Sequence, residues 1–263
     1  MSKPTVLAIA AHPDDIEIMM AGTLSLLGDA GYELHMLNIA NGSGGSMTQS
    51  AGAIAARRWE EAQAAAKALG ATMHPPLCDD LMVFYNEPLL RRVAAVVREV
   101  APSIILTQPP QDYMEDHMNS CRLAVSAGFV RGVPNFQSDP PRPHVENETR
   151  VYHALPWGLC DPLGAPVHST HYVDVTAKLA LKREALACHA SQKDWLDATQ
   201  GLDSYLDTME TVTREVGRRS GRFEAAEGWR RHLNYGYCAA GADPLCEALG
   251  DTLVIRTEEN LAP

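Results

Sequence analysis

The feature that most constrains the fold is an apolar run near the N-terminus that leads directly into acid and imidazole side chains. Val6 to Ala11 are six consecutive apolar residues, the pattern of a strand buried on both faces of a parallel sheet. His12, Pro13, Asp14 and Asp15 follow at once. Pro13 cannot donate to a neighbouring strand, so we expect the strand to end at His12. Ligands of an open α/β sheet bind at the carboxyl ends of strands, which makes this junction the first candidate site.

The residues after this junction predict a helix. Apolar side chains recur at helical spacing from Ile16 to Leu27, and Asp14 or Asp15 is suited to cap the first turn. Further on, apolar strand-like segments alternate with amphipathic or alanine-rich ones. This β-α-β-α order predicts a mostly parallel sheet with right-handed crossovers. The predicted strands are 33–40, 73–77 and 103–108, and the predicted helices are 51–70, 87–100 and 118–130.

The second half of the chain carries a weaker pattern. Residues 134–150 are rich in Pro, Asn and Asp and predict a long loop that either covers a site or only connects elements. Beyond it we expect strands at 151–155 and 171–175, a helix from Thr176 that extends past Gln192, and a helix at 205–216.

The chain shows no internal repeat and no linker that would divide it. We therefore expect residues 1–263 to form a single α/β domain. From Ala239 onward the sequence predicts a loosely held tail with one short apolar segment, Leu253 to Ile255.

The composition limits the class of partner. The formal net charge is −11, whereas binding to nucleic acid or to an anionic membrane needs concentrated Lys and Arg. No apolar run approaches the roughly 20 residues of a membrane span, and acidic residues come too early for a signal peptide. Six cysteines lie at wide spacings without a CxxC pair, which predicts reduced thiols. We expect a cytoplasmic protein that acts on a small molecule, and a homo-oligomer remains open.

A second cluster of acids and imidazole follows the predicted strand 103–108 and ends at His117. Together with His12 and Asp15 it supplies two imidazoles and one carboxylate, the ligand set of a catalytic zinc with a fourth position for water. Zinc lowers the pKa of such a water toward about 7. A hydrolase also needs a base near this water, and Asp14, beside the ligands, is the natural candidate.

Simpler structural interpretations exist for each of these residues. Asp14 and Asp15 could only cap a helix, and Arg58 with Glu61 could be a solvated pair one helical turn apart. The glycine-rich loop Gly42 to Gly45 could approach a ligand or merely connect, and its spacing is not GxGxxG. The location of the acids at two strand ends favours the metal site.

These residues resemble a known family. Ala11 to Asp15, AHPDD, is similar to the signature of the LmbE-like, or PIG-L, de-N-acetylases, which hydrolyse acetamido groups on glucosamine-containing substrates. Other segments fall in the family's order over most of the chain. They are Arg58-x-x-Glu61 with Leu69-Gly70, the Asp80 segment, Asp112 to His117, Cys188 to Gln192, and Ala226 to Trp229.

The resemblance implies a Rossmann-like three-layer α/β sandwich. It also implies one zinc ion per chain, with other divalent metals as alternatives, held by His12, Asp15 and His117. Asp14 would be the general base. Asp116 would orient His117 through its free ring nitrogen or cap the following helix.

One position departs from the family's pattern. The family's second motif ends His-x-Asp-His, and its first His polarises the substrate carbonyl; here that position is Met114. A thioether cannot donate a hydrogen bond, so this role is left to zinc, moved to another side chain, or lost. Tyr113, His153 and His189 are the candidate substitutes.

The sequence therefore leads to a main hypothesis and two alternatives. The main one is a zinc-dependent hydrolase that removes an acyl group, expected to be acetyl, from a small N-acylated amino sugar or related amide. Arg58, Asp80, Tyr113 and His189 are candidate substrate-binding or supporting residues. The first alternative is a catalytically weakened, zinc-containing sugar-binding module, because of Met114. The second, a nucleotide-binding protein using the glycine loop, is disfavoured by the glycine spacing and the acidic pair.

Overall fold

The computed structural model of the chain describes residues 3–192 and 205–256. Strand β1 lies in the middle of an eight-stranded sheet whose order is β3-β2-β1-β4-β5-β7-β6-β8. Strands β1 to β5 pair in parallel, whereas β7 is antiparallel to both β5 and β6, and β8 is antiparallel to β6. The strands are β1 (Thr5–Ala10), β2 (Glu33–Asn38), β3 (Thr72–His74), β4 (Ile104–Thr107), β5 (Arg150–Ala154), β6 (His171–Asp174), β7 (Ala226–Arg231) and β8 (Leu253–Ile255).

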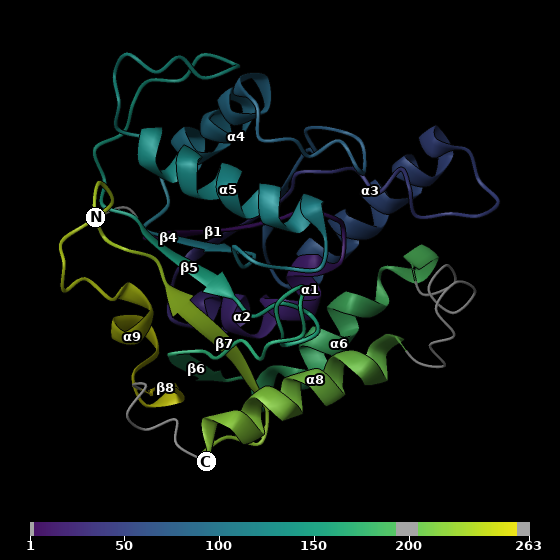
Figure 1. Cartoon of the computed structure of the whole chain (residues 1–263), viewed down its shortest axis with the longest axis vertical. Helices are drawn as coiled ribbons and strands as arrows, with labels where there is room; N and C mark the ends of the chain where they lie inside the picture. The colour runs from purple at the N-terminus through teal and green to yellow at the C-terminus, as the bar shows by residue number, and fades with distance from the viewer. Residues whose placement is uncertain (1–2, 193–204, 257–263) are drawn as a thin grey trace.

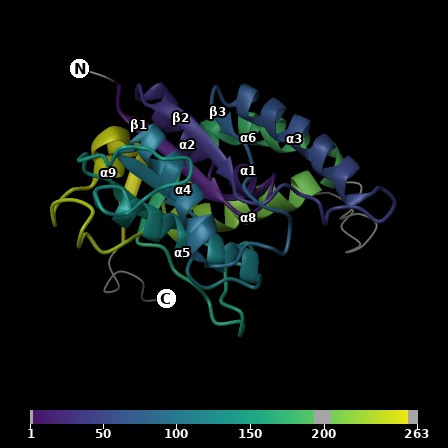
Figure 2. The same ribbon diagram turned by 90° about the horizontal axis from the view of Figure 1, so that it is seen from above.

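Helices cover both faces of this sheet, which gives three layers (Figures 1 and 2). Helices α4 and α5 pack on one face, and α2, α6 and α8 lie on the other (Figure 1). The predicted α/β sandwich with a mostly parallel sheet is confirmed. The helices are α1 (Asp15–Met19), α2 (Ala21–Asp29), α3 (Ala51–Ala68), α4 (Glu87–Val100), α5 (Glu115–Val130), α6 (Leu179–Ala187), α8 (Tyr205–Ser220) and α9 (Pro244–Leu249), with 3-10 turns at Thr176–Lys178 and Gly250–Thr252.

The alternation of side chains along β1 explains why its sequence is apolar throughout. Val6 and Ala8 belong to the core on the α2 side, and Leu7 and Ile9 belong to the core on the α4 and α5 side. All four are fully buried. A strand with helices on both faces needs apolar residues at every position.

The connections reverse direction beside β1. The chain passes from β1 through α1 and α2 to β2 on one side of the sheet, and β4 joins β1 on its other edge. The carboxyl ends of β1 and β4 therefore meet at a topological switch point, where α/β sheets place their ligands. His12 follows β1, and the segment from Gln108 to His117 follows β4.

Four details differ from the sequence-based expectations. The single helix expected from Ile16 to Leu27 is broken at Met20, whose φ of −134° is not helical. Strand β7 was not predicted. The expected helix from Thr176 begins as a 3-10 turn, continues as α6 and ends at Ala187. Its extension past Gln192 lies outside the described residues. The fourth is the chain's end.

The segment from Ala239 to Arg256 is not the loosely held tail that the sequence suggested. Asp243 caps α9 by accepting a hydrogen bond from the Cys246 amide, and β8 extends the sheet at β6. Leu245 is fully buried. All six cysteines are unpaired, as predicted. No helix in the described part of the chain has the length and hydropathy needed to cross a bilayer.

Candidate metal centre

A cavity of about 610 Å³ opens at the carboxyl ends of β1, β2 and β4. His12 and Asp15 line it from the β1 end, Gly44 and Gly45 from the loop after β2, and His117 from α5. The predicted loop 134–150 contributes none of the described residues that line this cavity. It connects α5 to β5 instead, and Arg98 donates to the Arg142 carbonyl in it.

The three predicted ligands come together in this cavity. One ligand atom from each of His12, Asp15 and His117 lies within 4.8 Å of the other two. Nδ1 of His12 is 3.5 Å from Oδ2 of Asp15, and Nε2 of His117 is 3.5 Å from Oδ1 of Asp15. Donors in a tetrahedral zinc site lie roughly 3.3 Å apart, so the group is close to the size that a bound ion requires.

In each imidazole, the ring nitrogen that faces away from the ligand cluster lies beside a further carboxylate. Nε2 of His12 is 3.0 Å from Oδ2 of Asp116, and Nδ1 of His117 is 3.1 Å from Oδ1 of Asp112. Carboxylates in this position fix the ring orientation and leave the inner nitrogen free for a metal. The sequence had suggested that Asp116 orients His117, but Asp116 lies beside His12 instead. The carboxylate beside His117 belongs to Asp112, which was not singled out.

The electrostatics of the cluster favour a cation. Burial opposes a charge on His12, but hydrogen bonds to Asp116 and Asp15 outweigh it and raise the pKa of His12 to about 10. Burial would also raise the pKa of Asp15, yet His117 and His12 lower it well below its ordinary value. The field of the buried carboxylates thus stabilises positive charge at the place where the three ligand atoms converge.

Asp14 does not use its side chain to cap α1. It occupies the N-cap position with φ 113°, a conformation that Asp and Asn tolerate better than other side chains, and its carboxylate makes no cap hydrogen bond. Tyr205 donates to its Oδ2 at 2.6 Å instead, and Nη2 of Arg58 lies 3.6 Å away. Burial raises the pKa of Asp14, although Arg58 opposes the shift. Asp14 lines the cavity beside the ligand group, where a base is needed.

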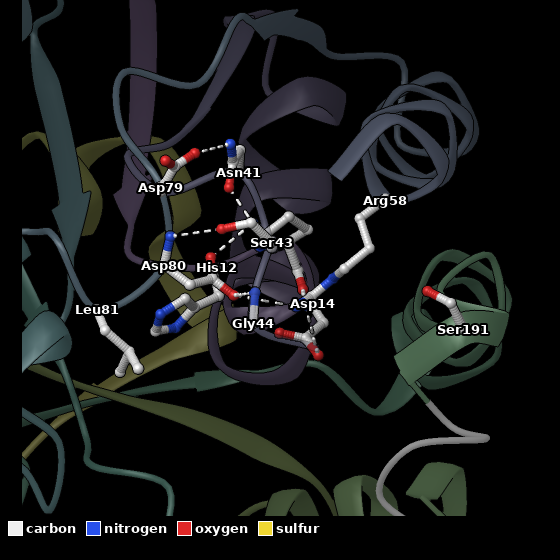
Figure 3. Close-up of polar contacts among 12 residues, drawn as sticks. His12, Asp14, Asn41, Ser43, Gly44, Arg58, Asp79, Asp80, Leu81 and Ser191 are labelled. Atoms are coloured by element: carbon white, nitrogen blue, oxygen red, sulfur yellow. Dashed lines mark hydrogen bonds and ion pairs between the residues drawn. The ribbon is translucent and has the colours of Figure 1, made fainter. Parts of the chain in front are cut away.

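Asp80 holds the glycine-rich loop (Figure 3), and Arg58 packs against it. Asp80 accepts hydrogen bonds from the amides of Gly42 at 2.6 Å and Gly44 at 2.9 Å, and its own amide donates to Ser43 Oγ. Arg58 comes from α3 and donates to the Pro13 carbonyl. A Cβ at Gly42 would lie 2.4 Å from Cδ of Arg58, so glycine is required for this approach.

Arg58 and Glu61 do not form the solvated pair that their spacing allowed. Arg58 is buried, with 3% of its surface exposed, and reaches the cavity. Glu61 accepts hydrogen bonds from the amide and the hydroxyl of Ser191. One face of α3 therefore serves both the cavity and the start of the segment after α6.

Met114, which stands where the family's pattern has a histidine, lines the cavity. Among the three candidate substitutes, Tyr113 lines the cavity and places its ring 5.3 Å from that of His117. His153 contacts the Gln108 carbonyl and His232. His189 is fully buried, 3.4 Å from Glu17, and neither His153 nor His189 lines the cavity.

Two residues of the site were not found from the sequence. Tyr205 is separated from Asp14 by most of the chain, and no local pattern links them. Asp112 belonged to a motif that had been recognised, but its partner could not be assigned because the turn between β4 and α5 has no regular spacing. Only the fold shows which carboxylate faces which imidazole.

Comparisons with known proteins find relatives that cover most of the chain. Residues 7–128 match the PIG-L family model, described as GlcNAc-PI de-N-acetylase. The chain is 29% identical to diacetylchitobiose deacetylase of Thermococcus kodakarensis, covering 86% of this chain and 82% of the relative. It is 26% identical to 4-oxalmesaconate hydratase of Pseudomonas putida, covering 72% of this chain and 74% of the relative.

Solved structures with the same fold include both kinds of enzyme. The 4-carboxy-2-hydroxymuconate hydratase GalB of Pseudomonas putida aligns with a TM-score of 0.74 at 22% identity, covering 91% of this chain and 99% of that one. The N,N′-diacetylchitobiose deacetylase of Pyrococcus horikoshii aligns with a TM-score of 0.73 at 23% identity, covering 93% and 89%. The AHPDD segment at the end of β1 lies in the part of the chain, residues 7–128, that matches the PIG-L family model.

Proposed function

We propose that this protein is a zinc-dependent hydrolase that removes an acyl group, expected to be acetyl, from the nitrogen of a small N-acylated amino sugar or related amide. The observation that carries the proposal is the convergence of His12, Asp15 and His117 within 4.8 Å in the same cavity as the buried acid Asp14. Two imidazoles and a carboxylate are a donor set that zinc accepts, and three protein ligands would leave a fourth position for water.

A bound zinc ion would supply Lewis acidity and a water whose pKa falls toward about 7. The chain's own residues do the remaining work. Asp14 accepts the proton of the attacking water at the carboxylate oxygen that Tyr205 leaves free, and later returns it to the departing amine nitrogen. Arg58 and Tyr205 hold the carboxylate in place while it does so.

The electrophilic side of the site differs from the usual family pattern. Met114 donates no hydrogen bond to a developing oxyanion. Tyr113 has a hydroxyl group and lines the same cavity, so it is the side chain best placed to donate one. A missing donor of this kind typically reduces kcat by about 10²–10³-fold, which leaves hydrolysis slow but measurable.

Sequence similarity alone does not distinguish a deacetylase from a hydratase, because relatives of both kinds cover most of the chain. The charge of the side chains that line the cavity supports an amide substrate. Four carboxylates line the cavity, those of Asp14, Asp15, Asp80 and Asp112. Arg58 is the one basic Arg or Lys side chain among the described residues that line it. A neutral amide fits this environment better than a substrate with several carboxylates.

The alternative is a zinc-containing sugar-binding module whose catalytic activity has weakened. It is motivated by Met114, and it shares the metal centre with the hydrolase. Metal content therefore does not separate the two functions, whereas turnover does.

The test is amine release from N-acetylglucosamine, N,N′-diacetylchitobiose and a simple N-alkylacetamide by the zinc-loaded protein. We expect release from at least one substrate, its loss on addition of a chelator, and its recovery on addition of zinc. A multiply charged unsaturated carboxylic acid tests for hydratase activity. Its hydration is measured as a loss of ultraviolet absorbance. Hydration of that acid without amine release would contradict the proposal, and no turnover with intact sugar binding would favour the binding module.

A further inference from the structure

Large apolar side chains lie exposed in the segment between β3 and α4. Between 45% and 63% of the surface is exposed in each of the four residues that form this apolar strip, Leu81, Met82, Phe84 and Tyr85. Val83, in the middle of the segment, is buried in the core on the α4 and α5 side. Single exposed apolar residues are ordinary, whereas four within five positions form a contiguous patch of the kind that marks an interaction surface.

The apolar strip runs alongside helix α5. At its start, the Leu81 amide donates to Oδ2 of Asp116 in the first turn of α5 at 2.7 Å. At its end, Oη of Tyr85 is 3.0 Å from Oγ of Ser126, about three turns further along the same helix. Between these points the guanidinium carbon of Arg122 lies 4.7 Å from the centre of the Tyr85 ring. Because these contacts hold the strip in place, little conformational entropy is lost when a partner binds to it.

Helix α5 presents two exposed charges beside the apolar strip. The helix belongs to the outer layer on its side of the sheet (Figure 1). Glu115 and Arg122 are both exposed, and because seven residues, about two helical turns, separate them, they lie on the same face. Neither side chain forms an ion pair within the described part of the chain. Aromatic residues, Met and Arg are the residue types that protein interfaces favour.

The positions of these charges favour a second copy of this chain as the partner. In a two-fold symmetric dimer each contact occurs twice, with the two residues exchanged between the copies. When two α5 helices cross antiparallel with the axis near Met118 and Asn119, Glu115 of each copy faces Arg122 of the other. The outer face of α5 is thus complementary in charge to itself. A partner of another sequence would not require an acid and a base at equal distances from one midpoint.

We propose that two copies of this chain associate through the apolar strip and the outer face of α5, with the helices antiparallel and Glu115 of each copy paired with Arg122 of the other. Removal of the strip from water supplies the main favourable free energy, and the ion pairs fix the orientation. Leu81 and Tyr113 are exposed and also line the cavity, so the second copy lies at the rim of the cavity. Association of this kind does not depend on the reaction that the cavity performs.

The experiment measures the dissociation constant of the dimer by analytical ultracentrifugation of the full chain over a series of concentrations. We expect the wild type to dimerise. Glu115→Arg and Arg122→Glu each place like charges opposite each other twice in the dimer, so each should raise the dissociation constant by about tenfold or more. The double variant restores opposite charges and should regain most of the affinity. Glu60→Arg reverses an exposed charge on α3, and as the matched control it should dimerise like the wild type.

A mixture of the two single variants gives the sharpest test. Glu115→Arg carries two cations on this face and Arg122→Glu carries two anions, so opposite charges meet only between the two different chains. We expect heterodimers in the mixture at concentrations where each variant alone is monomeric. Three outcomes overturn the proposal: a wild type that stays monomeric at every concentration, single variants that dimerise like the wild type, or a mixture that stays monomeric. Binding of a monomeric wild type to phosphatidylcholine vesicles would assign the apolar strip to a lipid surface instead.

Discussion

Asp14, the proposed base, differs from its neighbours in backbone conformation and in side-chain contacts. Its φ of 113° turns the carboxylate away from the first turn of α1 and toward the cavity. Non-glycine residues rarely adopt this conformation, and it persists where the surroundings hold it, here through Tyr205 and Arg58. Asp15, the next residue, instead accepts a hydrogen bond from the His12 amide and faces the two imidazoles.

The first prediction separates these two neighbouring acids. Asp14→Asn keeps the side-chain shape and tolerates the same backbone conformation, but it removes the proton acceptor. We expect zinc content to stay as in the wild type, and amine release to fall by about 10²–10⁴-fold. Asp251→Asn, at an exposed position in the second 3-10 turn, is the control. Full turnover by Asp14→Asn would show that another group is the base.

The second prediction concerns the carboxylates behind the imidazoles. Asp112→Asn and Asp116→Asn each remove the charge that holds one histidine ring. We expect each to weaken zinc binding by about 10–100-fold, measured by competition with a chromogenic chelator. Glu115→Gln, an exposed acid in the first turn of α5, should leave the affinity unchanged. Wild-type affinity in both aspartate variants would mean that neither carboxylate orients its ring.

Strand β7 could not be predicted from its own sequence. Ala226 to Arg231 has neither an apolar run nor regular alternation. Glu227 in it is nevertheless buried, because its carboxylate accepts from the amides of Gly22 and Thr23 in the first turn of α2 and from Lys182 of α6. The segment Ala226 to Trp229 was recognised as a family motif. A strand could not be predicted from it, because the burial of Glu227 depends on partners that are distant in the sequence.

The third prediction tests this connection between β7, α2 and α6. Glu227→Gln leaves the Lys182 ammonium group buried without its counter-charge, so we expect the free energy of unfolding to fall by about 3–5 kcal/mol. Urea denaturation measures this change. Adding Lys182→Met to Glu227→Gln removes the unpaired charge and should restore part of the loss. A change below about 1 kcal/mol in Glu227→Gln would mean that the pair contributes little beyond a surface ion pair.

The elements that could be predicted share a strong local signal. The six apolar residues of β1, the alanine-rich α3 and the amphipathic α4 each carry their own periodicity, and the structure has them near the expected bounds. The break at Met20 and the end of the chain lack such periodicity. The start of α9 did carry a cap signal, with Asp243 at the N-cap followed by Pro244, but the short helix behind it was too brief to reveal a period.

On the scale of the whole molecule, the site joins parts of the chain that are far apart in sequence. The proposed metal ligands follow β1 and β4, the carboxylates beside their imidazoles follow β4, and Tyr205 comes from α8. The AHPDD segment allowed two of the three ligands, His12 and Asp15, to be predicted together, since they lie only three residues apart. Contacts such as that of Tyr205 depend on how the second half of the chain folds back over the first.

Strand β5, where the sheet changes from parallel to antiparallel pairing, contains a buried histidine that links several elements. His153 in β5 contacts the Gln108 carbonyl after β4, Cys121 of α5 and, through Nε2 at 2.9 Å, His232 after β7. Burial lowers the pKa of His153 to about 4; the Gln108 carbonyl opposes this shift, while His232 and Arg230 add to it. The folded protein therefore holds this ring neutral at a pH where the unfolded chain protonates it.

The last prediction follows from this difference. Above its ordinary pKa of about 6.5 His153 is neutral in both states, and its contribution to stability is fully present. As the pH falls from about 6.5 to about 4 the unfolded state alone gains a proton, so the free energy of unfolding decreases, by at most about 3 kcal/mol. Below about 4 both states are protonated and the loss from this group stops. His12, His117 and His189, whose pKa values are raised, have the opposite dependence.

The contribution of His153 is therefore measured as the difference between wild type and His153→Asn in urea unfolding at a series of pH values. The variant should be less stable near neutral pH, and its deficit should shrink as the pH falls toward about 4, because only the wild type loses stability through this ring. His168→Asn removes an exposed histidine and should give a difference that does not change with pH. If the deficit of His153→Asn is constant between about pH 6.5 and 4, the ring is not held neutral in the fold, and its contacts with Gln108 and His232 stabilise by packing alone.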